Sequence, residues 1–468
     1  MTFTGIVTNA MAGMNASTLR AEILSYNIAN AETEGFARRS VSFEAVVPGG
    51  VRSTGIVRAD AGRLELQLLD AQTRTSAFED RAEALSAINQ GFGEVGDTEG
   101  LYAVFSRFEE ALSDLRLTPE SGAAQLSFLR EAQGVADTFA RLDDEAQAIR
   151  FNADATIADG VRSINDALTE LDDLNTAARR PKGVSIDDIA ERQSQLVGQI
   201  ADQLDITVSG SYGEEISIRT KGGYQLLGED PQFLEFTKAG SMGFDFTLAS
   251  GALSGLTAGG YDITPGTTQG IADGRLAANF AIRDVLGTDY ANRLDAAAEE
   301  LVVRLEAADT TATGGLFTLT AGLDSAAQRM AIDPSVDPAQ GGELYRLRDG
   351  VGALVEGPAA GAGVLGALKI ALDEPRPLPV ATGTSSEYSY LDMLGTVASE
   401  LGSASLRAQG LRDAALSTQT TLSEDVVRRI GVDTDRELQD LLLVEQAFAA
   451  NARVIQAADE MLRQLLEI

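Results

Sequence analysis

The feature that most constrains the fold of this chain is a long run of helical periodicity in its first half. Apolar residues recur at spacings of three and four from Val135 to Leu171, which is the pattern of one face of an α-helix. Thr118-Pro119-Glu120 precedes the run and predicts a helix start, with Thr as N-cap and Pro at the first helical position. The helix should extend over about 50 residues, roughly 75 Å. Residues 179–183 should end it, and a second helix over 185–204 should return alongside, so we expect a long helical hairpin.

Both ends of the chain carry a narrower apolar stripe at spacings of three and four. Such a stripe is typical of two helices that pack along a coiled-coil seam. The first stripe contains alanine and serine, which would let a partner helix approach closely. We therefore predict that the first and last segments pack together, although an ordinary amphipathic core helix fits the spacing equally well. The stripes are Val7, Ala10, Met14, Ser17, Ala21, Leu24 and Ile28, and Leu441, Val444, Phe448, Asn451, Ile455, Ala458, Leu462 and Leu465.

A small β-rich insert is predicted to begin at residue 205. Ile206 and Val208 alternate with polar residues, and Lys221-Gly222-Gly223 is typical of a hairpin turn. Further strands are expected at 233–236 and 244–248, and an earlier one at 64–68, where three leucines alternate with other residues.

We therefore expect an α+β fold that is mainly α. Its parts should be a long helical, coiled-coil core formed by the N- and C-terminal segments, a central helical hairpin and a small β-rich outer domain. The expected units are 1–70 (N-terminal helix and extended segment), 71–204 (helical domain with the hairpin), 205–272 (β-rich insert), 273–308 (returning helix), 309–385 (mixed α/β and Gly/Ala-rich segment) and 386–468 (C-terminal helices).

Composition excludes several classes of function. The chain has 37 Lys+Arg against 70 Asp+Glu, a formal net charge of −33, which argues against nucleic acid and anionic membrane surfaces as partners. It has no His and no Cys, so it cannot contain Ser-His-Asp or Cys-His catalytic systems, thiolate zinc sites or disulfides. No apolar run is long enough for a membrane helix, and residues 1–15 do not have the pattern of a signal peptide.

Two motifs that could carry chemistry are better explained structurally. Residues 361–366 match G-x-G-x-x-G, but a strand is not predicted before them, as a dinucleotide site requires. Acidic pairs at 143–144, 172–173 and 187–188 are not embedded in a calcium-binding loop pattern and fit solvated helix faces in an acidic chain. We expect no catalytic residues, no cofactor and no metal.

Both ends of the chain contain motifs that resemble those of a known protein family. Ser25-Tyr26-Asn27-Ile28-Ala29-Asn30 followed by Thr33-Glu34-Gly35-Phe36-Ala37-Arg38 resembles the N-terminal signature of the bacterial flagellar rod, hook and hook-associated proteins. The segment from Glu437 to Leu466 looks like the closing helix of the same family. Within that family, the predicted hairpin over 118–204 resembles the hook-associated members at the hook–filament junction.

The resemblance implies a structural adaptor, without enzymatic activity, that joins the hook to the filament-side junction proteins. It implies export through the flagellum without a cleavable signal peptide and an extracellular place at the hook–filament junction, with the β-rich insert facing outward. The implied partners are copies of the chain itself, the hook protein, the next hook-associated junction protein and an export chaperone that binds the C-terminal helix. Nucleic acid and membrane insertion are not expected.

The residues expected at the assembly interface lie in both terminal segments. For the apolar ones, packing within the chain is an equally good interpretation, whereas Asn27, Asn30 and Arg38 favour specific contacts or turn geometry. The set is Ala10, Met14, Ala21, Leu24, Asn27, Ile28, Asn30, Gly35, Phe36, Arg38, Val444, Phe448, Asn451, Arg453, Ile455, Leu462 and Leu465.

Two alternatives remain open on the sequence alone. The chain could be the flagellar hook subunit, which a short or absent 118–204 hairpin would favour. A more distant alternative is a carboxylate-based polysaccharide hydrolase, which needs two carboxylates about 5 to 10 Å apart in a cleft.

Overall fold

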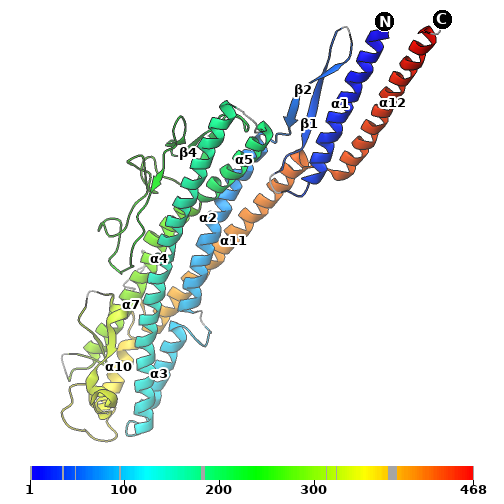
Figure 1. Ribbon diagram of the computed structural model, residues 1–468. Helices are drawn as coiled ribbons and strands as arrows, with labels where there is room; N and C mark the ends of the chain where they lie inside the picture. Colours follow the sequence, from blue (N-terminus) through cyan, green and yellow to red (C-terminus); the bar gives the residue numbers. More distant parts are fainter. Residues whose placement is uncertain are drawn as a thin grey trace.

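The computed structural model describes residues 3–33, 36–47, 49–93, 96–180, 185–311, 314–322, 324–377 and 387–466. These residues form an elongated, mainly α-helical molecule with several small antiparallel sheets (Figure 1). Two parts are distinguished by their packing. We call the elements α1 (Phe3–Ala29), β1 (Arg39–Ala45), β2 (Val51–Arg58) and α12 (Thr434–Leu466) the terminal unit. Everything from α2 (Arg63–Phe92) to α11 (Tyr390–Ile430) is called the body. Within the described ranges, no helix is both long and apolar enough to cross a membrane.

The predicted hairpin forms the long axis of the body. Helix α4 (Gly122–Arg179) has 58 residues, about 87 Å at 1.5 Å per residue, and α5 (Ile186–Gln203) packs back against it. The predicted start is wrong by one turn. Thr118 ends α3 (Leu101–Leu117), and Ser121 is the N-cap of α4, where its Oγ accepts a hydrogen bond from the Ala124 amide at 3.2 Å. Of the predicted break, residues 181–183 lie outside the described residues.

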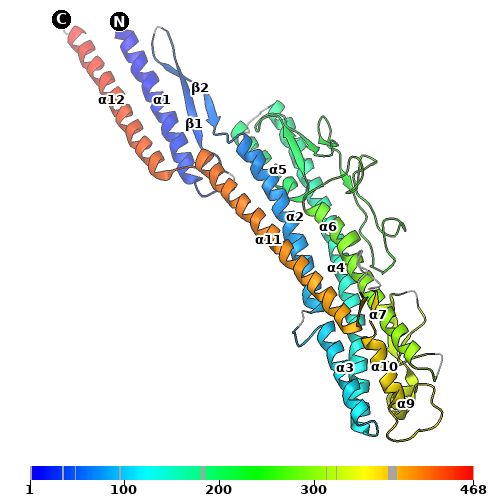
Figure 2. The ribbon, with the colours of Figure 1, turned by 180° about the vertical axis from the view of Figure 1, so that it is seen from behind.

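Two further helices run beside this hairpin. Helix α2 (Arg63–Phe92) packs along α11 (Tyr390–Ile430) for much of its length (Figure 2). The strand predicted at 64–68 is wrong, because these residues are the first turns of α2. Leu64 and Leu68, four residues apart, contact one small apolar cluster, whereas Leu66 is 51% exposed. The alternating leucines therefore follow the i, i+4 spacing of a helix face.

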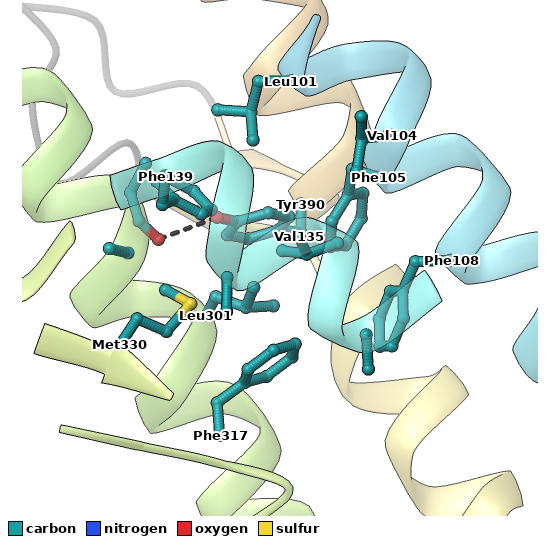
Figure 3. Close-up of a cluster of buried hydrophobic side chains, with 14 of the residues drawn as sticks. Leu101, Val104, Phe105, Phe108, Val135, Phe139, Leu301, Phe317, Met330 and Tyr390 are labelled. Carbon is teal, nitrogen blue, oxygen red and sulfur yellow. Dashed lines mark hydrogen bonds between the residues drawn. The ribbon is translucent and has the colours of Figure 1, made fainter. Parts of the chain in front are cut away.

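The half of the body far from the terminal unit contains a large apolar core that is rich in aromatic rings. Phe105, Phe108 and Phe139 are fully buried together with Tyr390, the first residue of α11 (Figure 3). The Tyr390 ring lies 4.6 Å from that of Phe105, and its hydroxyl donates a 2.8 Å hydrogen bond to the Ala297 carbonyl oxygen. Buried aromatic rings remove large apolar areas from water, so this core joins α3, α4, α7 and α11 into one packed unit.

A second apolar core attaches the β-rich insert to α4, α5 and α6. The turn predicted at residues 221–223 is confirmed, since it joins β4 to β5, but the strand predicted at 244–248 is wrong, because those residues form turns. The insert consists of two three-stranded sheets, β3-β4-β5 and β6-β7-β8. Their strands are β3 (Ile206–Ser209), β4 (Ser217–Thr220), β5 (Gln225–Leu227), β6 (Leu234–Glu235), β7 (Thr257–Ala258) and β8 (Tyr261–Asp262).

The returning helix and the mixed segment complete the body. The returning helix predicted within 273–308 is present, but the π-helical turn η1 (Ile282–Leu286) divides it into α6 (Arg275–Ala281) and α7 (Gly287–Ala308). The G-x-G-x-x-G match lies where α10 begins and is preceded by a loop rather than a strand. The remaining elements are β9 (Phe317–Leu319), α8 (Ala326–Arg329), β10 (Met330–Ile332), η2 (Pro334–Val336), η3 (Pro338–Gln340), α9 (Tyr345–Asp349), α10 (Gly363–Asp373), β11 (Arg376–Pro377) and β12 (Glu387–Tyr388).

The terminal unit projects from one end of the body. Helices α1 (Phe3–Ala29) and α12 (Thr434–Leu466) run antiparallel, so that both chain ends lie at the same tip (Figures 1 and 2). The hairpin of β1 (Arg39–Ala45) and β2 (Val51–Arg58) lies along α1. The predicted packing of the two terminal segments is thus confirmed.

Candidate assembly interface

One row of residues on each terminal helix forms the seam between α1 and α12. Ala10, Ser17 and Leu24, seven residues apart, are buried on α1, and Val444 and Ala458 are buried on α12. Gly13 lies directly against α12, because a Cβ there would lie 2.7 Å from Nδ2 of the Asn451 side chain. Small residues therefore set the distance between the two backbones, as the composition of the stripe predicted.

The other half of each stripe is left uncovered. Val7, Met14, Ala21 and Ile28 are only partly buried on α1. On α12, Phe448 and Leu462 remain 39% and 40% exposed, and the flanking Leu442 and Leu443 remain 59% and 60% exposed. Two helices can cover only one side of each other, so this unit presents apolar side chains for which the described residues provide no cover.

Helix α1 also has an unusually uncharged surface. Its 27 residues include only Arg20 and Glu22 as charged side chains, in a chain that is 23% charged overall. Arg20 lies 3.8 Å from Asp440 of α12 and so faces the seam partner. Helix α1 itself thus carries no net charge, so like-charge repulsion between copies of this helix is small.

The polar residues of the N-terminal signature form a buried hydrogen-bond network at the base of the terminal unit. Asn27 is fully buried, and its Nδ2 donates to the Arg39 carbonyl oxygen at 2.8 Å and to Oε2 of Glu437 at 3.0 Å. Its Oδ1 accepts a hydrogen bond from the Arg39 amide at 2.9 Å. Arg38 Nε donates to the other oxygen of Glu437 at 2.5 Å. Charge-assisted bonds of this kind are the stronger class of hydrogen bond, and here they join α1, β1 and α12.

The remaining predicted interface residues lie around this hydrogen-bond network or on the exposed face of α12. Asn30 Nδ2 donates to the Tyr26 carbonyl oxygen at 2.9 Å at the end of α1, and the buried ring of Phe36 lies 5.7 Å from the Tyr26 ring. On α12, Ile455 is half-buried and Arg453 is exposed. Gly35 and the side chain of Leu465 lie outside the described residues. Contact of all these residues with neighbouring subunits stays a prediction.

Sequence reasoning missed the most central members of the hydrogen-bond network, Arg39 and Glu437. A glutamate seven residues before Val444, on the same stripe, was the available signal, because a charged residue on a seam requires a buried partner. The Arg39 guanidinium lies 4.5 Å from the centre of the Tyr26 ring, and its Nη2 lies 3.1 Å from Oδ1 of Asp188 on α5. Arg39 therefore extends from the terminal unit to the body.

The described residues give little support to catalysis. None of their acidic side chains gather in threes as a metal site would need, and the pairs at 143–144, 172–173 and 187–188 lie on helices. A cavity of about 950 Å³ between α2, α11 and the insert is lined by the single carboxylate of Asp70. Asp70 is paired with Lys221 and Arg74, so the two-carboxylate arrangement of a glycoside hydrolase is not found there.

Two family models match this chain. The model described as the flagellar hook-associated protein FlgK helical domain matches residues 85–314, which include α4 and α5, and the model described as the flagellar basal body rod FlgEFG protein C-terminal matches 426–468, which include α12. The chain belongs to the flagellar hook-associated protein family. The match to the hook-associated helical domain, which contains the long hairpin, argues against the hook-subunit alternative.

Relatives agree over different lengths of the chain. Flagellar hook-associated protein 1 of Bacillus subtilis is 22% identical over 99% of this chain and 98% of its own length. The proteins of the same name from Salmonella typhimurium and Escherichia coli are 23% and 24% identical over 47% of this chain, which corresponds to 42% and 43% of theirs. The flagellar hook junction protein FlgK from Burkholderia pseudomallei aligns in space at 18% identity over 55% of this chain and 47% of its own, with a TM-score of 0.45.

Membership of this family makes the chain a structural component of the bacterial flagellum rather than an enzyme. Its assembly with other axial proteins of the flagellum follows from the same membership.

Proposed function

We propose that this chain is the adaptor that joins the hook to the filament-side junction proteins, and that its terminal unit makes the joining contacts. The observation that carries this proposal is the uncovered apolar face of α12 beside the nearly uncharged α1. A lone subunit leaves this surface in water, whereas neighbouring helices would cover it. Head-to-tail contacts of this kind generate rings or helical arrays of copies.

The partners we propose are further copies of the chain, the hook protein on one side and the next hook-associated junction protein on the other. The predicted interface residues on the uncovered face, Phe448 and Leu462 among them, are the ones that would contact these neighbours. The β-rich insert lies on one side of the body, in the half nearer the terminal unit (Figure 1), and we propose that it faces outward. In this arrangement the chain is exported without a cleavable signal peptide and is extracellular.

Before assembly the same face of α12 would serve an export chaperone. An amphipathic helix with exposed Leu442 and Leu443 suits a protein that receives a helix in an apolar groove. In a binding titration with the purified flagellar export chaperone of the same cell, replacing both leucines by aspartate should abolish binding. The matched change Leu406→Asp, at an exposed leucine of α11 in the body, should have no effect.

The location can be tested directly by immunogold labelling of intact flagella with an antibody against residues 205–270. Label concentrated at the hook–filament boundary would support both the adaptor role and the outward position of the insert. Label along the whole hook would identify a hook subunit instead, and label found only in the cytoplasm would overturn the proposal.

Assembly itself can be tested by complementing a cell that lacks its own copy. Phe448→Ala or Asn451→Asp should reduce the number of cells with filaments, while the exported protein keeps a folded body. Leu406→Ala is the matched control on α11, and we expect it to complement fully. Equal effects of Phe448→Ala and Leu406→Ala would contradict the special role of the α12 face.

A further inference from the structure

The loop between α9 and α10 is braced at both of its ends. At its start, the Val351 amide donates a 2.7 Å hydrogen bond to Oδ2 of Asp309. At its far side, the Gly357 amide donates to Oδ2 of Asp349 at 2.8 Å, and the Gly357 carbonyl oxygen accepts from Nη2 of Arg348 at 3.2 Å. Arg348 is only 2% exposed. A buried arginine and two carboxylates therefore fix the backbone on either side of the few residues between them.

The braced segment holds apolar side chains in water. Leu354 and Val355, which lie between the two fixed ends, are 87% and 77% exposed. Glu356 follows them, 3.5 Å from Arg348, with 65% of its side chain exposed. A loop that is already ordered loses little conformational entropy when it binds. We call residues 353–356 the loop tip, and its rigid support suits it to insert into a partner.

An apolar groove is open to water elsewhere on the body. It is the cavity of about 950 Å³ between α2, α11 and the insert. Leu66 of α2 and Leu411 of α11 line it and are 51% and 53% exposed. Within α11, all of whose residues are described, no side chain between Ala408 and Val426 is buried. A groove of this size has room for several aliphatic side chains, and it leaves apolar surface uncovered.

The charge of the groove favours an acidic occupant. Its charged lining residues are three cations, Arg63, Arg74 and Lys221, and the single carboxylate of Asp70. The chain as a whole has a net charge of −33, so two copies repel each other over most of their surface. A positive groove is a place where an acidic segment of another copy is attracted instead. The loop tip combines the two required properties, since Glu356 follows its two apolar side chains.

The loop tip and the groove lie in different halves of the body. Helices α9 and α10 are at the end far from the terminal unit, whereas the groove is formed by the first turns of α2 and the later turns of α11, in the nearer half (Figure 2). They meet when a second copy is displaced along the long axis of the first. Such a head-to-tail contact repeats from copy to copy and generates a ring or helical array.

From these observations we propose that the loop tip of one copy inserts into the groove of a neighbouring copy. Leu354 and Val355 are then covered by the leucines of α2 and α11, and Glu356 faces the cations of the groove. This inference rests on the proposed assembly of copies of the chain, and it adds a contact between bodies to those of the terminal unit.

The contact can be trapped in assembled flagella of a cell that lacks its own copy. Because the chain has no Cys, Ala353→Cys in the loop tip and Ala414→Cys in the groove lining place one cysteine on each surface. A short bismaleimide reagent should join neighbouring copies into a ladder of covalent oligomers, whereas either cysteine alone should give at most dimers. Val355→Cys with Leu422→Cys is a second pair for use if the first does not assemble.

The matched control is Ala353→Cys with Leu406→Cys, an exposed position of α11 outside the groove lining. It should give no ladder. Cells that carry filaments and contain a tip–groove cysteine pair but give no ladder would overturn the contact.

A charge at the loop tip tests the same contact without cysteines. Leu354→Arg places a cation against the positive groove and should leave few cells with filaments, while the purified variant keeps its helical circular dichroism because the side chain is exposed. Leu406→Arg, at a leucine that is 70% exposed on α11, should complement fully. Full complementation by Leu354→Arg would overturn the proposal. Loss of filaments without a ladder in the cysteine chains would also overturn it, because the loop tip would then bind a different protein.

The ladder reports contact between bodies, whereas the immunogold label reports where the chain lies. A label at the hook–filament boundary without a ladder would refute this contact and leave the adaptor role standing. A ladder together with label along the whole hook would do the reverse.

Discussion

The body and the terminal unit use the same kind of helix in opposite ways. The body encloses two apolar cores, one of them rich in buried aromatic rings, and its long helices are covered on several sides. The terminal unit buries a single row of mostly small side chains and leaves leucine and phenylalanine in water. A helix that packs within its own chain on one side only gains further stability when helices of a neighbouring subunit cover its other side. The body is thus held together by its own apolar cores, whereas the terminal unit presents apolar surface that neighbours can cover.

The largest effect should come from the body core. Phe139→Ala removes a fully buried ring of α4, and such a truncation typically costs about 3–5 kcal/mol. Urea unfolding followed by circular dichroism should therefore show a large loss in the free energy of unfolding. A loss below about 1 kcal/mol would mean that the body is as loosely packed as the terminal unit, and the contrast between the two would fail.

A smaller, local loss of stability should follow from removing Glu437 from the buried hydrogen-bond network. Glu437→Ala leaves Asn27 and Arg38 without their carboxylate partner, and breaking a buried pair in this way costs about 3 kcal/mol. Hydrogen exchange should accelerate in α1 and α12, with the body unchanged. The matched control is Glu445→Ala, at an exposed position on the same helix. Faster exchange throughout α4 would show that the two regions are not separable.

The third prediction concerns pH and the junction between the regions. Burial raises the pKa of Glu191 above its ordinary value of 4.5, against the opposing effect of Arg58. The folded chain therefore holds this proton more tightly than the unfolded chain. The resulting stability is complete below pH 4.5 and is lost as pH rises through the raised pKa.

Glu191→Gln should remove this dependence. At pH 7 it should raise the free energy of unfolding by less than about 1 kcal/mol, because it replaces a carboxylate whose charged form is disfavoured by burial. The advantage should shrink as the pH approaches 4.5. Paired urea titrations of the two chains at pH 7 and pH 5 would show it, and an advantage that grows at pH 5 would contradict the assignment.

The smallest effect on stability should come from the uncovered face. Phe448→Ala should change the free energy of unfolding by less than about 0.5 kcal/mol, since the ring is already partly in water. Its effect on assembly should be large by contrast. A loss of several kcal/mol in urea unfolding would show that the ring serves packing within the chain.

The periodicity of apolar residues was sufficient to predict the long helices, because an apolar face that repeats over many helical turns fits only an α-helix. It failed at Leu64 to Leu68, where three leucines fit a strand and a helix face alike and only the neighbouring cluster decides between them. It could not show which half of the Val7–Ile28 stripe faces α12, since both halves have the same spacing. The buried role of Glu437 depends on Asn27, which no local pattern connects to it. The resemblance located both ends of the candidate site but not the contacts within it.

The bond between Asn27 and Glu437 joins residues that are 410 positions apart. Contacts of such separation form slowly, because the chain between them must first be brought together. The body, whose helices α2 to α5 are close in sequence, can fold first and shorten that distance. In a growing polypeptide, α1 must therefore wait without its partner until nearly the whole body has followed it, and the seam is among the last parts of the subunit to close.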